Sequence, residues 1–102
     1  WTENAYGKND PDRVVLCVSL QAEQNGKTVW HQTYAMDAWG TEASTAMARL
    51  VSKPVSFGIK AVLANQIPTG VTAAPDDPKL VDAWLSEIAK LAQHLEIVDH
   101  TA

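Results

Sequence analysis

The sequence predicts an α+β domain, with a mixed sheet of three to four strands built on an antiparallel hairpin and with helices packed on one face. Apolar residues alternate with other residues over 13–24, and a similar segment returns over 27–39. The apolar period changes from two residues to 3.6 after Gly40, and a second amphipathic segment covers residues 78–94. Alternation indicates strands and the longer period indicates helices, so both kinds of element are expected in one chain.

The hairpin is expected to follow a polar lead-in over residues 1–12. The Asn25-Gly26 pair between the two strands is typical of a type I′ turn, since both residues tolerate positive φ. A two-residue turn places Gln24 opposite Lys27, and we expect that register to hold along the hairpin. One face then packs on helices and carries Leu16, Val18, Leu20, His31, Thr33 and Ala35. The other is aromatic and half polar, with Val15 opposite Met36, Cys17 opposite Tyr34 and Gln21 opposite Trp30.

A hairpin alone is marginally stable in water, so the sheet needs a third strand. The segment LEIVDH, residues 95–100, is the stronger candidate, and GVTA at residues 70–73 is the weaker one.

The first helix is expected to begin near Thr41, whose side chain can cap it, with Glu42 favourably placed against the helix dipole. Pro54 removes a backbone donor and is expected to kink or restart this helix. The residues after Pro54 are almost all apolar, which predicts burial, and Gly58 would let another backbone approach closely.

The second helix has a clear start signal, because Asp77 can cap it and Pro78 suits its first position. An apolar stripe then runs along one face and consists of Leu80, Val81, Trp84, Leu85, Ile88, Leu91 and Leu95.

Composition limits the possible functions. The chain has 102 residues, enough for a single domain over residues 1–102, and its net charge of −4 argues against a nucleic-acid partner. No apolar run is long enough to span a membrane, and no signal segment opens the chain, which begins with Trp1 like an excised domain. Cys17 is the single cysteine, which is compatible with the cytoplasm.

The sequence carries little catalytic chemistry. The three histidines are far apart in sequence and one cysteine cannot complete a structural zinc set, so no metal site is expected. The five glycines are scattered and form no phosphate-binding loop, so we expect this chain to bind neither NAD nor NADP. His31 is expected to lie on the packed face of the hairpin. No catalytic residue is assigned.

Candidate substrate-binding residues lie where the second strand meets the first helix: Thr41, Thr45 and Arg49. A helix start near Thr41 would offer unpaired N–H groups to an anion. Thr45 and Arg49 are four residues apart and share a helix face, from which an arginine can grip a carboxylate. Alternatively, Arg49 is solvated or paired with a structural partner, and Glu42 would repel an anion.

Three segments resemble the C-terminal domain of the saccharopine dehydrogenase-like (saccharopine reductase-type) oxidoreductases, and together they cover residues 13 to about 98. The hairpin is similar to two strands of that family and their Gly-Lys turn. The segment STAMARLVSKPVSFGIKAVLANQIPTGVTAAP resembles its Thr-Ala-Met-Ala sequence, proline-interrupted helix and Gly-Val connector. The segment LVDAWLSEIAKLAQHLEI resembles its closing helix and short strand. Ser52-Lys53 stands where the family commonly has Gly-Leu.

This resemblance implies a substrate-binding or dimerisation domain of an NAD(P)-dependent oxidoreductase with a carboxylated substrate. It implies three partners for the chain: its own N-terminal nucleotide-binding domain, that substrate and, in a homodimer, a second copy. The domain alone would be inactive, because the cofactor that carries the hydride belongs to the other domain. The alternative from another class is a stand-alone protein-interaction module that uses the aromatic hairpin face.

Overall fold

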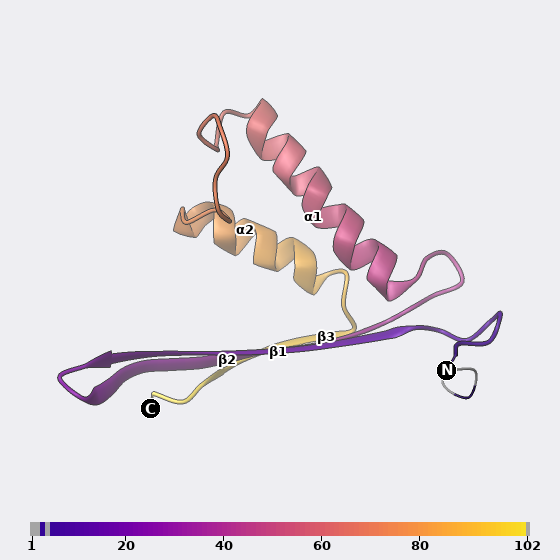
Figure 1. The fold of residues 1–102 in the computed structure, drawn as a ribbon, viewed down its shortest axis with the longest axis horizontal. Coiled ribbons are helices and arrows are strands. Elements are labelled where there is room, and N and C mark those ends of the chain that lie inside the picture. Colours follow the sequence, from indigo (N-terminus) through magenta and orange to yellow (C-terminus); the bar gives the residue numbers. More distant parts are fainter. Residues whose placement is uncertain (1–2, 4, 102) are drawn as a thin grey trace.

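The computed structural model describes residues 3 and 5–101 and confirms the α+β class. Two long strands form the hairpin, and two helices and a short strand follow. Both helices lie on one side of the sheet, as predicted (Figure 1). In chain order the elements are β1 (Arg13–Gln24), β2 (Lys27–Trp39), α1 (Ala46–Leu63), α2 (Pro78–Ala89) and β3 (His94–Asp99).

The sheet has the order β1-β2-β3 and is antiparallel at both contacts rather than mixed. The third strand is the predicted LEIVDH segment, whereas residues 70–73 lie in the connector between the helices. The direction of β3 follows from the path of the two helices, because α1 runs back along the sheet and α2 returns (Figure 1). The chain therefore enters β3 beside the end of β2 and has to run antiparallel to it.

A β-bulge changes the predicted register of the hairpin. Gln24 does lie opposite Lys27, but Glu23 pairs with Thr28 and Ala22 pairs with Trp30, so Val29 is an extra residue on β2. Beyond the bulge every partner on β2 is shifted by one residue relative to the prediction. Because side chains alternate between faces, this shift moves each residue of β2 to the opposite face.

The two faces of the sheet are therefore more different than the sequence indicated. Tyr34 lies opposite Val18 and Met36 lies opposite Leu16, so the aromatic and apolar residues share the helix-facing side. The opposite, open face carries most of the polar side chains, and His31 lies there, opposite Gln21. The prediction that His31 lies on the packed face is wrong, because the bulge turned it outward.

A hydrogen-bonded group of hydroxyls and imidazoles lies on the open face, near the middle of the hairpin. Ser19 Oγ lies 2.9 Å from His31 Nε2 and accepts from Thr33 Oγ1 at 3.1 Å. Thr33 Oγ1 also lies 3.0 Å from His100 Nε2, and the centroids of the two imidazole rings are 4.4 Å apart. These contacts join β1 and β2 to the residue that follows β3.

Helix α1 begins later than predicted and is largely uncovered. Its N-cap is Thr45, whose hydroxyl accepts from Ala48 N at 3.1 Å, and the helix continues through Pro54 to Leu63 without a break. The expectation that the residues after Pro54 are buried is wrong, because Val55, Ile59 and Val62 are 56–60% exposed in the described structure. A Cβ at Gly58 would meet no atom within 4 Å, so no backbone approaches closely there.

Helix α2 begins as predicted, with Asp77 accepting from Lys79 N at 3.1 Å and Pro78 in the first turn. It ends at Ala89 rather than near residue 94, because the chain turns there to enter β3. Leu95 therefore contributes to the sheet instead of to the helical stripe.

The core of the described structure is small. Only Met36, Ala38, Ala46, Ala61 and Leu80 are buried among its apolar residues. The radius of gyration is 17.1 Å, whereas about 13 Å is typical of a compact chain of this length. Helix α2 covers the sheet loosely and leaves an apolar groove of about 350 Å³, lined mainly by Leu16, Val18, Leu20, Tyr34, Met36, Val81, Leu85, Ile88 and Leu95.

Candidate functional site

The N-terminus of α1, predicted to bind an anion, already holds a carboxylate of the same chain. Asp12 Oδ1 accepts from Ala46 N at 2.7 Å, and Asp12 Oδ2 accepts from Met47 N at 2.9 Å. These two N–H groups belong to the first turn of the helix, where the dipole favours negative charge. The bonds to Met47 and Ala46 hold the pKa of the Asp12 carboxyl below its usual value.

The position of Asp12 depends on the end of β2. Its carbonyl accepts from Gly40 N at 2.7 Å, and a Cβ at Gly40 would lie 2.2 Å from Asp12 Oδ1. Gly40 is therefore required here for close approach. Sequence reasoning assigned Asp12 to a lead-in segment, because a carboxylate that caps a helix from far along the chain has no local pattern.

Arg49 joins three segments of the backbone. Its Nη2 donates to the carbonyls of Trp39 at 2.7 Å and Leu91 at 3.2 Å, and its Nη1 donates to the carbonyl of Ser44 at 3.2 Å. Arg49 thus holds together the end of β2, the approach to α1 and the turn after α2. This geometry corresponds to the alternative interpretation of Arg49, an arginine with structural partners.

Gln93, which sequence reasoning missed, supports the same junction. Its Oε1 accepts from Trp39 N at 2.7 Å, and its Nε2 donates to the Trp39 carbonyl at 3.3 Å. The Gln93 amide therefore bonds both the N–H and the carbonyl of Trp39, which lies beyond the last β2–β3 pair, Asp37 and His94.

Thr41 and Arg49 are brought together in one hollow of about 370 Å³ between the start of α1 and the turn after α2. Thr45 does not line it, since its hydroxyl caps α1. The cations Arg49 and Lys90 lie in this wall and no carboxylate does. The lining residues are Thr41, Ala43, Ser44, Arg49, Lys90, Leu91, Ala92 and Gln93.

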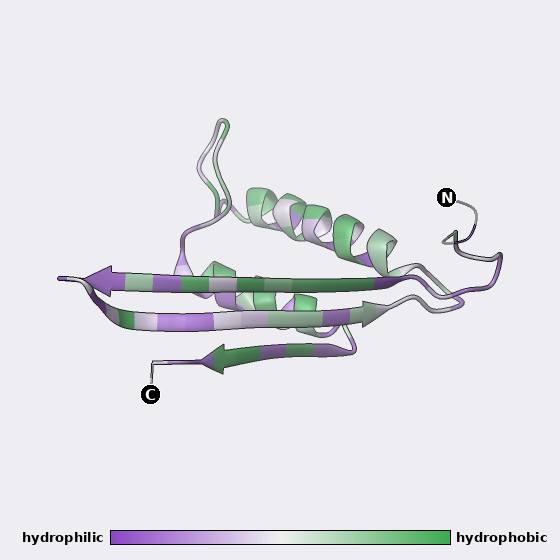
Figure 2. Ribbon diagram, turned by 60° about the horizontal axis from the view of Figure 1, so that its bottom comes forward, coloured by the Kyte–Doolittle hydropathy of each residue, from purple (hydrophilic) through white to green (hydrophobic). Residues whose placement is uncertain are grey.

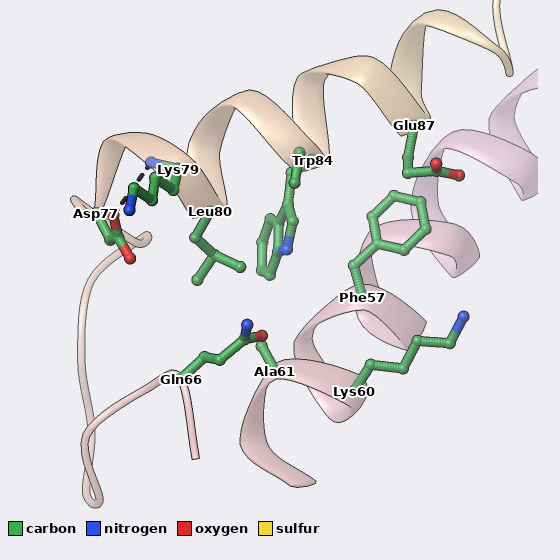
Figure 3. Close-up of a pocket in the computed structure, with 10 residues that line it drawn as sticks. Phe57, Lys60, Ala61, Gln66, Asp77, Lys79, Leu80, Trp84 and Glu87 are labelled. Atoms are coloured by element: carbon green, nitrogen blue, oxygen red, sulfur yellow. Dashed lines mark hydrogen bonds between the residues drawn. The ribbon is translucent and has the colours of Figure 1, made fainter. Parts of the chain in front are cut away.

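A second hollow, of about 360 Å³, lies between the two helices (Figure 3). Phe57 from α1 and Trp84 from α2 both point into it, with ring centroids 6.2 Å apart (Figure 3). Two lysines and two carboxylates surround these rings, so the hollow favours neither sign of ligand charge. These four residues are Lys60, Lys79, Asp77 and Glu87.

In the described structure an apolar stripe runs along the exposed side of α1, and we define it as Met47, Val51, Val55, Ile59 and Val62. These side chains are 56–60% exposed. They recur every three or four residues and therefore lie on one side of the helix. Figure 2 shows the apolar colouring that recurs along α1. Exposed apolar residues gathered on one face are typical of a surface that a protein, a membrane or a ligand covers.

The described residues contain no group of three or more His, Cys, Asp or Glu side chains that could hold a metal ion. Within the same part of the chain, neither helix combines the length and the hydrophobicity needed to cross a lipid bilayer.

A thin antiparallel sheet with two helices on one side of it defines a small α+β domain, and one of its helices has an exposed apolar face. The comparison with known families gives this class a specific member. The saccharopine dehydrogenase C-terminal domain matches residues 1–92, and the chain belongs to this family. This match confirms the resemblance in the hairpin, the proline-containing helix and the connector. No curated protein and no solved structure matches the chain.

Proposed function

We propose that the chain is the docking and substrate-side domain of a saccharopine dehydrogenase-type NAD(P)-dependent oxidoreductase, packed through α1 on the N-terminal nucleotide-binding domain of that enzyme. The apolar stripe of α1 carries this proposal. Five apolar side chains in contact with water are unfavourable, and burial against a partner domain gains about 25 cal/mol per Å² of apolar area. The family membership names the kind of enzyme in which such a partner domain occurs.

Gly58 supports the same contact. It lies within the stripe, since it is seven residues from Val51 and four from Val62. A glycine inside a helix costs about 0.5–1 kcal/mol relative to alanine, and nothing in the described structure requires it. A second protein surface in close contact with the backbone of α1 would account for this residue.

The residues of this chain do not fit a dinucleotide. Its glycines are scattered through the sequence, and its two helices follow each other without an intervening strand, whereas a dinucleotide fold alternates strand, glycine loop and helix. In the proposed enzyme the nicotinamide cofactor therefore binds to the N-terminal domain. No step of the reaction is assigned to a residue of this chain.

The alternative, a stand-alone interaction module, needs an exposed aromatic face on the hairpin, and the bulge in β2 turns the aromatic residues of that face toward the helices. Tyr34 lines the groove under α2 instead of an exposed aromatic face, and Trp30 and Met36 share its side of β2.

The test compares the isolated chain with the full-length enzyme by hydrogen exchange and activity. Amides of α1 should exchange more slowly in the full-length enzyme. Val55→Glu should lower activity and the melting temperature of the full-length enzyme while leaving the secondary structure of the isolated chain intact. Lys53→Glu, which places the same residue on the opposite side of α1, is the matched control. Equal rates of amide hydrogen exchange in α1 of both proteins would contradict the proposal.

A second role, in substrate binding, is favoured by the cationic hollow that contains Thr41 and Arg49. Its wall carries Arg49 and Lys90 and no carboxylate, which suits a carboxylated substrate, and Lys90 would exchange its present partner Glu87 for that substrate. Thr45 contributes by fixing the start of α1. Because Arg49 already bonds three carbonyls, a substrate would have to share its donors.

Arg49→Ala in the full-length enzyme separates the two roles of this residue. Loss of a charged hydrogen bond to substrate should lower kcat/KM by an amount worth about 1.5–3 kcal/mol, and Arg49→Lys should recover part of it. The melting temperature is measured on the same variants. A lower melting temperature with unchanged kcat/KM at permissive temperature would leave Arg49 as a purely structural residue.

A further inference from the structure

Strand β1 forms one edge of the sheet, and its outer side faces no other strand in the described structure. It is 12 residues long, and half of its backbone N–H and C=O groups point away from β2. Natural edge strands are usually protected by lysine, proline or a bulge. β1 contains neither lysine nor proline, and the extra residue of the bulge lies on β2.

The side chains along this edge are apolar and exposed. Leu16, Val18 and Leu20 are 39–52% exposed on the helix-facing side, and Val15 is 64% exposed on the open side. In Figure 2 the middle of β1 has the colour of hydrophobic residues. An edge of this length and composition favours pairing with another strand.

We propose that β1 pairs with β1 of a second copy of this chain, antiparallel and about a two-fold axis through Val18. Val18 then faces Val18, and Leu16 of each copy faces Leu20 of the other. The axis is perpendicular to the sheet, so the helices of both copies lie on the same side. The result is one continuous sheet with the order β3-β2-β1-β1-β2-β3.

Charge selects the second copy and this register. The same axis places Arg13 of each copy opposite Glu23 of the other, so that the two charged ends of β1 complement each other. Both side chains project from the open face, because odd-numbered residues of β1 share that face. Arg13 binds Asp37 through Nε at 2.9 Å and Nη2 at 2.7 Å, which leaves its Nη1 for the second carboxylate.

In this register β1 is complementary to itself. A closed two-fold contact needs a surface that matches itself, and a shift of one residue would move Val18 off the axis and place Leu16 opposite Ser19 or Gln21. The proposal does not depend on the oxidoreductase function, since it concerns two copies of the same domain.

The first test measures association by sedimentation over a wide range of concentrations of the 102-residue chain. We expect a concentration-dependent dimer. Val18→Lys should weaken it by about tenfold or more, because two like charges would meet on the axis. Ile97→Lys changes another exposed apolar residue, 51% exposed compared with 39% for Val18, on the same side of the sheet but at the other edge, and it should leave the dimer intact.

The second test fixes the register and works even if Val18→Lys does not fold. In a Cys17→Ser background, Val18→Cys should form a disulfide or a short bis-maleimide cross-link between copies, and Ile97→Cys should not. Glu23→Arg should weaken the dimer by about threefold to tenfold, and adding Arg13→Glu should restore part of the affinity. A chain that stays monomeric, or a cross-link at residue 97 instead of residue 18, would overturn the proposal.

Discussion

At the scale of single residues, Asp12 occupies the place that a bound anion would take. Its two oxygens accept from Ala46 N and Met47 N, while Thr45 caps Ala48 N. The start of α1 is therefore satisfied within the chain. A carboxylated ligand would compete with Asp12 there, and the cationic hollow beside Arg49 is the more favourable place for it.

Asp12 also gives α1 a dependence on pH. Its pKa is lowered in the folded state by the bonds to Met47 and Ala46, so its contribution to stability is complete above about pH 4 and is lost as the pH falls through the folded-state pKa. Asp12→Asn should lower the melting temperature at pH 7 and reduce the fall in stability as the pH drops below about 4.

Thermal unfolding followed by circular dichroism at several pH values checks this prediction. Asp10→Asn is the control, because Asp10 accepts only from Gly7 N in the lead-in segment and does not touch a helix. If both variants respond to acid in the same way, Asp12 does not act as a cap of α1.

At the scale of elements, the bulge in β2 decides which side chains meet. With the bulge, Tyr34 and Met36 join the leucines and valines of β1 under the helices. Without it they would face outward, and His31 would lie beneath α2. One extra residue therefore sorts the sheet into an apolar side and a polar side.

Helix α1 offers a prediction about Gly58, whose position in the described structure has room for a side chain. Gly58→Ala should stabilise the isolated chain by about 0.5–1 kcal/mol, because alanine loses less conformational entropy in a helix. In the full-length enzyme the gain should shrink or reverse if another backbone packs on α1.

Urea unfolding of both proteins measures this difference. Gly26→Ala is a contrasting variant, since Gly26 has φ of 73° in the hairpin turn and alanine is strained there. A loss of stability for Gly58→Ala in the isolated chain would show that α1 is already covered within the domain.

At the scale of the whole molecule, a few buried residues hold an open structure together. Leu80 is 8% exposed and lines the hollow between the helices. Leu80→Ala should cost about 2–4 kcal/mol, a large share of the stability of a small domain. The measurement is urea unfolding with Leu63→Ala as the control, because Leu63 is 78% exposed.

Comparable losses for the two leucines would mean that the helices are not held together by Leu80. A loss confined to Leu80→Ala would show that the contact between α1 and α2 limits the stability of the domain.

Local patterns by themselves determined the α+β class, the hairpin with its Asn-Gly turn, the start of α2 and the third strand. Each of these follows from neighbours in sequence, namely alternation, turn residues with positive φ, and a capping aspartate before proline. The same is true of the family resemblance, which rests on short segments in a fixed order.

Only the tertiary structure decided the register of β2, the start of α1, the partners of Arg49 and the exposure of the α1 stripe. The bulge depends on packing across the whole hairpin, and Asp12 reaches the start of α1 from more than 30 residues away. Burial depends on which surfaces meet, and an apolar helix has the same sequence pattern whether its partner is this chain or another domain. Long-range contacts therefore fixed the candidate site, because local propensity contains no information about them.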